Sequence, residues 1–126
     1  MITGIGLDVC KIARMEELLK DDRFLSRYFC PEEQEYIRAK GQSAADTMAG
    51  IFAAKEALVK CLGTGFADTK LQDIVVLHDK YGAPCYELRG AYQMHAAQRS
   101  ITSLHLSITH DGGVAAAVCI AERAEK

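Results

Sequence analysis

The chain has 126 residues, of which 49% are apolar and 25% are charged, and its formal net charge at pH 7 is -2. This length and composition predict one globular domain over residues 1–126. The charge excludes a general basic surface for nucleic acid, and no apolar run reaches the ~18 residues of a membrane span. The N-terminus has no charged region followed by an apolar stretch, which argues against a secretory signal, so we expect a cytoplasmic protein.

The cysteines are scattered along the chain and form no Cys-x-x-Cys pair. There are five of them, at positions 10, 30, 61, 85 and 119. A disulfide framework or a structural zinc site would require closer and even-numbered spacing. We therefore expect reduced cysteines that pack as small apolar residues.

The first predicted element is a strand over residues 2–9, which are apolar and interrupted by glycine. Strand alternation places Asp8 on the same face as Gly6. The opposite face is apolar and carries Ile5, Leu7 and Val9.

Helices are predicted next. Residues 11–28 favour a helix that breaks near Asp21 and Asp22. Pro31, followed by two glutamates, marks a new helix start, because proline and acidic residues favour the first turn. This helix is expected to run to about Lys40.

The longest predicted helix begins near Ser43, where Ser43 and Asp46 form a plausible capping pair, and runs to about Leu62. Its apolar residues recur at helical spacing, which predicts the central helix of the fold. Small residues along it would let another backbone or a ligand approach closely; these are Gly50, Ala53, Ala54 and Ala57.

The second half of the chain is rich in strands. The predicted strands cover residues 74–77, 85–88, 104–109 and 114–120. Turn residues at 79–84 and 110–113 separate them in pairs, and residues 90–99 favour a short helix. This order of elements predicts an α+β fold in which a mainly antiparallel sheet wraps around the long central helix.

Asp8, Glu56 and Lys60 are the first candidates for chemistry. Glu56 and Lys60 are four residues apart and share one helix face. Their alternative role is a surface ion pair worth only ~0.3–0.5 kcal/mol, and that of Asp8 is a turn or capping residue. The helix around Glu56 is apolar or small on most sides, which favours a site. Two carboxylates suit Mg²⁺, which completes its shell with water and phosphate.

Further candidates are weaker. Lys60 and the backbone N–H groups of Gly63–Gly65 suit phosphate oxygens, although Gly-Thr-Gly also serves as a helix C-cap. On the strand Ser107–His110, Ser107 and Thr109 share a face and His110 opens the turn; the alternative is a polar strand edge. A basic helical face, with Arg14 upstream, comprises Lys20, Arg23 and Arg27. Acidic residues interrupt that face, so a solvated surface is its alternative.

The residue patterns alone therefore indicate a metal-assisted enzyme acting on phosphate. The chain contains no G-x-S-x-G elbow, no P-loop and no G-x-G-x-x-G fingerprint, so it offers no nucleophile of its own.

The chain resembles the holo-acyl-carrier-protein synthases, which are small 4′-phosphopantetheinyl transferases. The resemblance covers nearly the whole chain and rests on five segments in the family's order and spacing. The segments are Gly4-Ile5-Gly6-Leu7-Asp8 followed by Arg14, Phe29 with Glu33, Phe52 to Lys60 with Gly63-Thr64-Gly65, Gly82-x-Pro84, and Ser107-Ile108-Thr109-His110.

The resemblance implies an activity and an assembly. The 4′-phosphopantetheine arm of coenzyme A would pass to a serine of apo acyl carrier protein, with adenosine 3′,5′-bisphosphate as by-product, in support of fatty acid biosynthesis. The family's fold would be expected, in a homotrimer with active sites between subunits.

The resemblance also implies residue roles. Asp8 and Glu56 would hold Mg²⁺, or Mn²⁺, and Lys60 would add positive charge at the pyrophosphate. The base would be Glu56 or a metal-bound water. Contacts with coenzyme A would come from Lys60, Gly63, Thr64, Gly65, Gly82, Pro84 and His110. Acidic carrier protein would dock on Arg14, Lys20, Arg23 and Arg27.

One position departs from the family pattern. Relatives often have arginine where this chain has Ile51, and the segment Gln42-Ser43-Ala44-Ala45 lacks the basic residues that relatives can carry. Those cations are expected to meet coenzyme A phosphate. We therefore expect weaker coenzyme A binding and little preference for coenzyme A over 3′-dephospho-coenzyme A, unless Lys40 or another cation substitutes.

Three other functions are compatible with parts of the pattern. A binding module for coenzyme A or a carrier protein would keep the fold but would not need both Asp8 and Glu56. A thioester enzyme of the hot-dog type would also use a long helix in a curved sheet, but would need no metal. A structural trimer would tolerate Glu56→Gln without a change in any ligand interaction.

Overall fold

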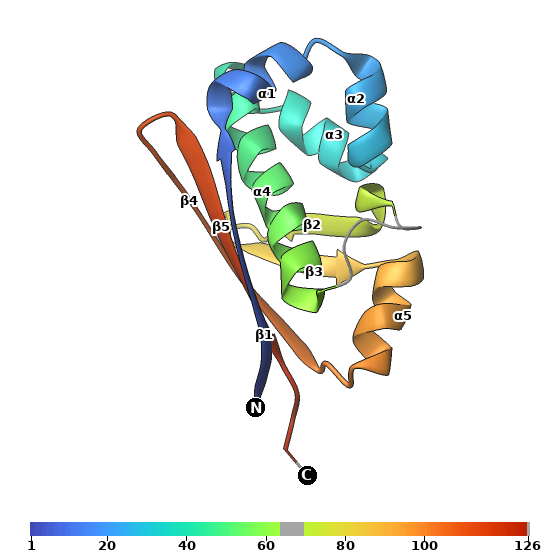
Figure 1. The fold of residues 1–126 in the computed structure, drawn as a ribbon. Helices are drawn as coiled ribbons and strands as arrows, with labels where there is room; N and C mark the ends of the chain where they lie inside the picture. Colours follow the sequence, from blue (N-terminus) through green and yellow to red (C-terminus); the bar gives the residue numbers. More distant parts are fainter. Residues whose placement is uncertain (64–69, 126) are drawn as a thin grey trace.

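Helix α4 (Ala44–Leu62) is the central element of the computed structural model, which describes residues 1–63 and 70–125. It packs against a three-stranded sheet on one side and against shorter helices and a two-stranded sheet on the other (Figure 1). The predicted α+β fold around a long helix is therefore confirmed.

The larger sheet has the strand order β1-β5-β4 and is antiparallel throughout. Its strands are β1 (Ile2–Lys11), β4 (Ser103–Asp111) and β5 (Val114–Glu122). Each is two or three residues longer than predicted from the sequence. In the register of the sheet, Asp8 lies opposite Ala117, which in turn lies opposite Ile108. Asp8 and Ile108 therefore lie on the two edge strands.

The smaller sheet is an antiparallel pair, β2 (Ile74–His78) and β3 (Pro84–Leu88). A 3₁₀ turn, η2 (Leu71–Asp73), leads into it, and α5 (Gly90–Gln98) follows it. In the turn between the strands, Oδ1 of Asp79 accepts hydrogen bonds from the backbone N–H groups of Tyr81 and Ala83, at 2.8 and 3.0 Å.

Three short helices precede α4: α1 (Ile12–Leu18), α2 (Asp22–Tyr28) and α3 (Pro31–Arg38). The predicted break near Asp21 is confirmed, because the Asp21 side chain accepts hydrogen bonds from the N–H groups of Arg23 and Phe24 and so starts α2 afresh. Pro31 occupies the first turn of α3, as predicted.

The predicted side-chain cap of α4 was wrong. Ser43 is the N-cap residue, but its side chain makes no capping hydrogen bond. A 3₁₀ turn, η1 (Gly41–Ser43), runs directly into the helix, and the N–H of Ala44 donates to the carbonyl of Gly41. The turn thus satisfies a backbone N–H group at the start of α4, in place of a bond to the serine hydroxyl oxygen.

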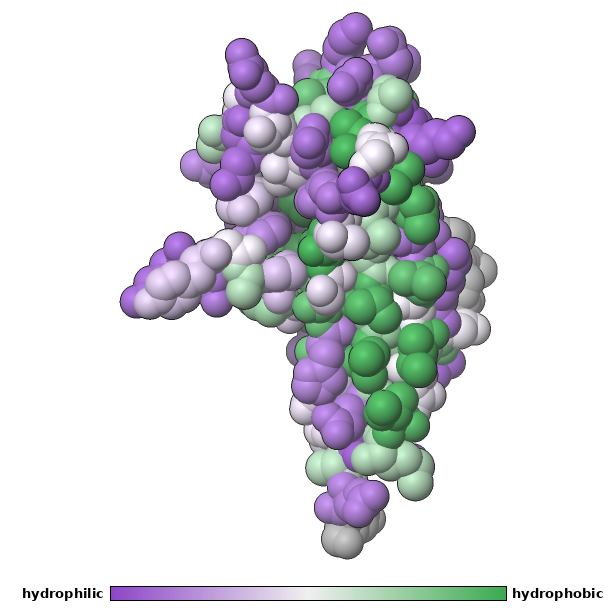
Figure 2. Space-filling model, turned by 90° about the vertical axis from the view of Figure 1, so that its left-hand side faces the viewer, coloured by the Kyte–Doolittle hydropathy of each residue, from purple (hydrophilic) through white to green (hydrophobic). Residues whose placement is uncertain are grey.

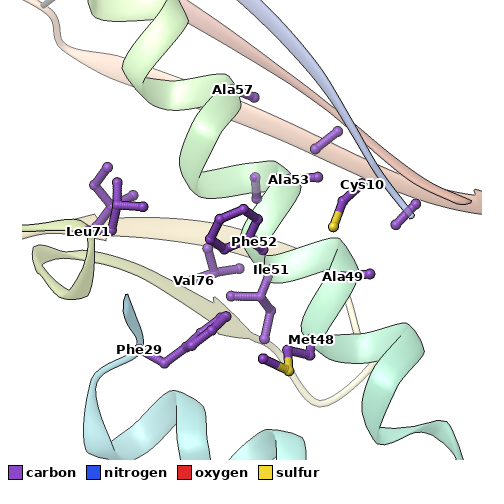
Figure 3. Close-up of a cluster of buried hydrophobic side chains, with 14 of the residues drawn as sticks. Cys10, Phe29, Met48, Ala49, Ile51, Phe52, Ala53, Ala57, Leu71 and Val76 are labelled. Carbon is purple, nitrogen blue, oxygen red and sulfur yellow. The ribbon is translucent and has the colours of Figure 1, made fainter. Parts of the chain in front are cut away.

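Strand β1 and helix α4 approach each other backbone to backbone. A Cβ atom on Gly6 would stand 1.8 Å from the carbonyl oxygen of Ala57, and one on Gly4 would stand 2.4 Å from that of Cys61. The α4 surface toward the larger sheet is correspondingly lined with small side chains, including Ala49, Ala53 and Ala57 (Figure 3). The expectation that small residues admit a second backbone is confirmed.

The other side of α4 carries the bulk of the core. Large buried side chains from several elements meet there, namely Phe29, Met48, Ile51, Phe52, Leu71 and Val76 (Figure 3). A fully buried ion pair lies beside them. Nζ of Lys55 lies 2.7 Å from Oε1 of Glu33 and also donates to the carbonyls of Leu71 and Ile74, at 2.8 and 2.6 Å. Oε2 of Glu33 accepts from the N–H of Val76 at 2.9 Å.

This pair joins α3, α4, η2 and β2 inside the core. Burial lowers the pKa of Lys55, and the Glu33 carboxylate opposes that shift. Since both charges are desolvated, the pair depends on its complete set of hydrogen bonds.

The outer face of the larger sheet is apolar and uncovered. Ile5, Leu7 and Val9 keep 63%, 60% and 57% of their surface exposed. Figure 2 shows hydrophobic side chains gathered in a continuous band on this face. All five cysteines are free, as expected. In the described part of the chain, no helix has the length and apolar character needed to cross a membrane.

Candidate active site

Asp8 and Lys60 meet where β1 packs on α4. Asp8 lies on the inward face of β1, and its Oδ1 is 2.7 Å from Nζ of Lys60, which also donates to the carbonyl of Leu7 at 3.2 Å. The Asp8 side chain is only 10% exposed, whereas that of Lys60 is 58% exposed. The hydrogen bond to Asp8 raises the pKa of Lys60, so this lysine is charged at pH 7.

Glu56 lies one helical turn before Lys60 and is half-buried. Burial raises the pKa of Glu56 to about 7, and the neighbouring Asp8 carboxylate contributes to this shift, while Arg14 and Lys60 act in the opposite direction. The two predicted carboxylates are therefore close enough to disfavour simultaneous ionisation when no cation lies between them.

The pair suits a divalent cation that needs few protein ligands. Oδ2 of Asp8 is buried and has no hydrogen-bond partner within residues 1–63 and 70–125. No cluster of three or more His, Cys, Asp or Glu side chains is assembled for a metal in those same ranges. Mg²⁺ fits such a site better than zinc, because it is held through one or two carboxylates and completes its shell with water and phosphate.

A cavity of about 560 Å³ opens beside Glu56. Aromatic and cationic side chains dominate its described lining, which comprises Arg14, Phe24, Arg27, Tyr28, Phe52, Glu56, Lys70, Leu71 and Gln72. The guanidinium carbon of Arg14 lies 5.6 Å from the centre of the Phe52 ring. The cavity thus combines a carboxylate with positive charge and apolar walls.

The three cations predicted to share one helical face, Lys20, Arg23 and Arg27, do not lie on one helix. Arg23 and Arg27 lie four residues apart on α2 and line a shallow hollow of its surface. Arg14 is on α1 and, with Arg27, lines the cavity beside Glu56. Lys20 lies between the two helices, where its Nζ is 3.5 Å from a carboxylate oxygen of Glu17. The break at Asp21 separates Lys20 from helix α2, which carries Arg23 and Arg27.

The glycine segment after α4 is described only at its first residue. Gly63 takes a left-handed conformation, with φ of 69°, and its N–H donates to the carbonyls of Val59 and Lys60. It therefore caps α4. Thr64 and Gly65 lie outside the described residues, so their contact with phosphate stays a prediction.

The remaining predicted coenzyme A residues line a separate cavity of about 400 Å³. Gly82, Pro84 and His110 meet there, together with Tyr36, Lys40, Ser43, Thr47, Gly50, His78 and Ile108. Nε2 of His110 donates to the carbonyl of Asp46 at 2.9 Å. His110 lies on β4 and Asp8 on β1, the opposite edge strands of the larger sheet.

Residues 4–119 match the sequence profile of the 4′-phosphopantetheinyl transferase superfamily. This chain belongs to that superfamily. Over 122 residues it is 45% identical to the holo-(acyl-carrier-protein) synthase of Treponema denticola, covering 97% of this chain and 99% of the relative.

Solved structures agree with the sequence match. The holo-(acyl-carrier-protein) synthase of Neisseria meningitidis superposes with a TM-score of 0.88 at 30% identity, over 98% of this chain and all of that one. The enzyme of Helicobacter pylori, solved in complex with coenzyme A, gives 0.79 at 33% identity, over 94% of this chain and 99% of that one. The family resemblance and the fold expected from it are thus confirmed.

The departure at Ile51 places an apolar side chain in the core of this transferase. Ile51 is 1% exposed and lies among core side chains such as Phe29 and Val76 (Figure 3), and it does not line the cavity that contains His110. Ser107 and Thr109 lie on the outer face of the sheet, in register with Val118 and Ala116. The inward face of β4 is presented instead by neighbouring residues such as Ile108.

Several residues of the transferase's two cavities were not predicted. The aromatic wall beside Glu56 is formed by Phe24, Tyr28 and Phe52. In the sequence, their spacing is typical of residues in a hydrophobic core. Tyr36 and His78 meet in the second cavity although 42 positions separate them. The four-residue spacing of Tyr36 and Lys40 in the sequence was the only local signal, although α3 itself ends at Arg38.

Proposed function

We propose that this transferase moves the 4′-phosphopantetheine group of coenzyme A to a serine hydroxyl of apo acyl carrier protein in a Mg²⁺-dependent reaction. The product besides holo-acyl carrier protein is adenosine 3′,5′-bisphosphate, and the setting is fatty acid biosynthesis in the cytoplasm. The observation that carries the proposal is the Asp8–Glu56 carboxylate pair next to Lys60. The names of its relatives support the carrier protein as acceptor.

The reaction exchanges one bond to phosphorus for another. The serine oxygen attacks the phosphorus next to the pantetheine arm, the bond from that phosphorus to the bridging oxygen breaks, and the nucleotide leaves with the bridging oxygen. Mg²⁺ held by Asp8 and Glu56 would offset the negative charge that develops on the pyrophosphate. Mn²⁺, which also prefers oxygen ligands, would serve in its place.

Lys60 and Glu56 complete this chemistry. Lys60 is exposed enough to turn from Asp8 to a phosphate oxygen and stabilise the leaving group. Glu56 must be ionised both to hold a cation and to accept the serine proton, so either role requires the same protonation state. The attacking group comes from the carrier protein, which explains why this chain contains no nucleophile motif.

We further propose that the working form is a homotrimer. The uncovered apolar face formed by Ile5, Leu7 and Val9 supports an association through the larger sheet. The separation of the two cavities supports it too, because coenzyme A would reach both if the carboxylates of one copy faced the second cavity of its neighbour. The three-fold count itself comes from the family resemblance.

The cations around the carboxylate cavity support docking of an acidic partner. Arg14 and Arg27 line that cavity, and Arg23 is exposed on the adjoining helix. An acidic helix of the carrier protein would be steered toward these residues and would bring its serine toward Glu56. Lys20, whose Nζ is 3.5 Å from a carboxylate oxygen of Glu17, would meet the partner from the turn between α1 and α2.

The test is intact-mass measurement of an apo acyl carrier protein after incubation with this protein, coenzyme A and Mg²⁺. We expect the mass gain of one phosphopantetheine group, no gain with EDTA, and none when the acceptor serine of the carrier protein is replaced by alanine. Asp8→Asn and Glu56→Gln should each abolish the gain, whereas Lys11→Ala on the same strand should not.

Other outcomes would favour the alternatives. Coenzyme A binding without any transfer to several carrier proteins would indicate a binding module. A reaction at a thioester that proceeds equally well with EDTA would indicate a thioester enzyme. Either result would overturn the proposed transfer.

A further inference from the structure

The second cavity, defined above by Gly82, Pro84 and His110, has the chemistry of an anion site. Its described lining includes one lysine and two histidines but no aspartate or glutamate. The carboxylate of Asp79, in the turn that precedes Gly82, is engaged by the N–H groups of Tyr81 and Ala83. A negatively charged group entering this cavity would therefore meet no opposing charge among its described walls.

Lys40 is held at the cavity by an aromatic stack. The rings of Tyr36 and His78 are nearly parallel, with centroids 4.3 Å apart and planes 6° apart. Nζ of Lys40 lies 4.5 Å from the centre of the Tyr36 ring. Such a contact restricts a long flexible side chain while leaving its ammonium group exposed, so less freedom is lost when an anion binds.

The stack is uncharged, and Lys40 supplies the permanent charge. Burial, and to a smaller extent the charge of Lys40, lower the pKa of His78, which is neutral at pH 7. Nδ1 of His78 is buried without a hydrogen-bond partner in the described structure. His78 thus acts as a flat surface beside the lysine, not as a second cation.

The cavity is kept open on the α4 side by Gly50. A Cβ atom at this position would stand 2.9 Å from Cγ2 of Ile108 and 3.1 Å from Nε2 of His110. The next residue, Ile51, is buried in the core and does not line this cavity. Lys40, one turn before α4, is the one lysine in the described lining of this cavity.

We propose that Lys40, held over the Tyr36–His78 stack, binds the 3′-phosphate of coenzyme A and makes this transferase prefer coenzyme A over 3′-dephospho-coenzyme A. The inference rests on the proposed function. Coenzyme A carries two phosphate groupings, and the pyrophosphate is assigned to the carboxylates and Lys60. The cavity lacking carboxylates then takes the phosphate on the ribose. Position 51, where relatives often have arginine, is isoleucine in this chain. Lys40, which precedes α4, supplies the positive charge for the coenzyme A preference instead.

The test compares the binding of two ligands, coenzyme A and 3′-dephospho-coenzyme A, by isothermal titration calorimetry at fixed Mg²⁺ and ionic strength. For Lys40→Met we expect roughly tenfold weaker binding of coenzyme A and less than about twofold change for the dephospho compound, the scale of one charge-assisted contact. Lys40→Arg should keep the preference. Lys80→Met is the matched control, since Lys80 also lies over a tyrosine ring, at 5.1 Å, but does not line the cavity.

Two results would overturn the inference: an equal loss for both ligands in Lys40→Met, or the same loss in Lys80→Met, which would show only general attraction. Intact-mass transfer assays on the same variants separate this inference from the proposed function. Transfer by the wild type with an unchanged ligand preference in Lys40→Met would refute the role of Lys40 alone. No transfer by the wild type would refute the proposed function.

Discussion

The proposed role of Glu56 and its raised pKa conflict when no cation is bound. In the proposed mechanism Glu56 acts in its ionised form, yet burial and Asp8 raise its pKa to about 7. A divalent cation held by Asp8 and Glu56 would remove this conflict, so cation binding should expel the proton that Glu56 keeps. In the proposed mechanism, the titration of this one side chain would link folding stability, metal binding and activity.

We predict that, without metal, stability falls as the pH rises from 5 to 8. The folded state holds the Glu56 proton up to a pH of about 7, whereas the unfolded chain loses it near 4.5. At pH values above the folded pKa, the loss in the free energy of unfolding is complete. It is on the order of 1 kcal/mol after allowance for the exposed half of the side chain. Urea unfolding at several pH values measures it.

The matched variant for that measurement is Glu56→Gln, which should show a smaller loss of stability over the same pH range. Added Mg²⁺ should restore the stability of the wild type at pH 8 and have little effect on the variant. A wild-type stability that rises between pH 5 and 8, relative to Glu56→Gln, would contradict the prediction.

For single residues, the sequence predicted that Asp8 and Glu56 would form a carboxylate pair, but it did not predict the stacking of Tyr36 on His78. Alternation along β1 and helical spacing along α4 place Asp8 and Glu56 on facing surfaces, and both rules act locally. The contact of Tyr36 with His78 depends on how α3 packs beside the smaller sheet, which no local pattern records. Lys55 shows the same limit, because only the fold brings Glu33 to it.

Among the elements, the contact of β1 with α4 admits no side chain at Gly6. We predict that Gly6→Ala destabilises the fold by about 3 kcal/mol, because the added methyl group must separate two backbones and cannot be accommodated by rotating a side chain. Denaturant unfolding measures the change, and Lys11→Ala, at an exposed position of the same strand, should alter stability by less than about 0.5 kcal/mol. An equal effect of both substitutions would contradict the packing argument.

The buried pair Glu33–Lys55 fastens four elements and should behave as a unit. Lys55→Met and Glu33→Gln should each cost about 3–5 kcal/mol, because each leaves a buried partner without its counterpart. The double variant should cost less than the sum of the two by about 2 kcal/mol. Strictly additive losses in a double-mutant cycle would show that the two side chains act independently.

The boundaries of helices and strands show which features are determined by residues close together in the sequence. The break before α2 was predictable because Asp21 caps the next helix from its own turn. The start of α4 was misjudged because η1 satisfies the helix end in place of a serine side chain. Competing local solutions of similar energy are not distinguished by a residue pattern.

For the whole molecule, the uncovered apolar face makes the state of association the main question. We predict that Leu7→Glu gives a folded monomer, because a carboxylate in the middle of this face cannot be buried between copies. Sedimentation velocity measures the mass, and circular dichroism checks the fold. Gln98→Glu adds the same charge at an exposed end of α5 and should leave the association unchanged.

That prediction also tests the proposed division of the site between copies. A monomeric Leu7→Glu variant should lose transfer activity even though Asp8, Glu56 and Lys60 are intact. Full activity in the monomer would show that one chain holds the complete site. The face itself was visible in the sequence as the alternation of Ile5, Leu7 and Val9, but the partner that covers it was not.

The contact between Gly6 and Ala57 has a consequence for which ions the molecule accepts. Asp8 lies two residues after Gly6, and Glu56 lies one residue before Ala57, so two touching main chains fix the gap between the carboxylates. Such a gap cannot widen easily for a larger ion. Bonds to Mg²⁺ measure about 2.0–2.1 Å and those to Ca²⁺ about 2.3–2.6 Å. We therefore expect selection by ionic radius, set by the absence of a side chain on Gly6.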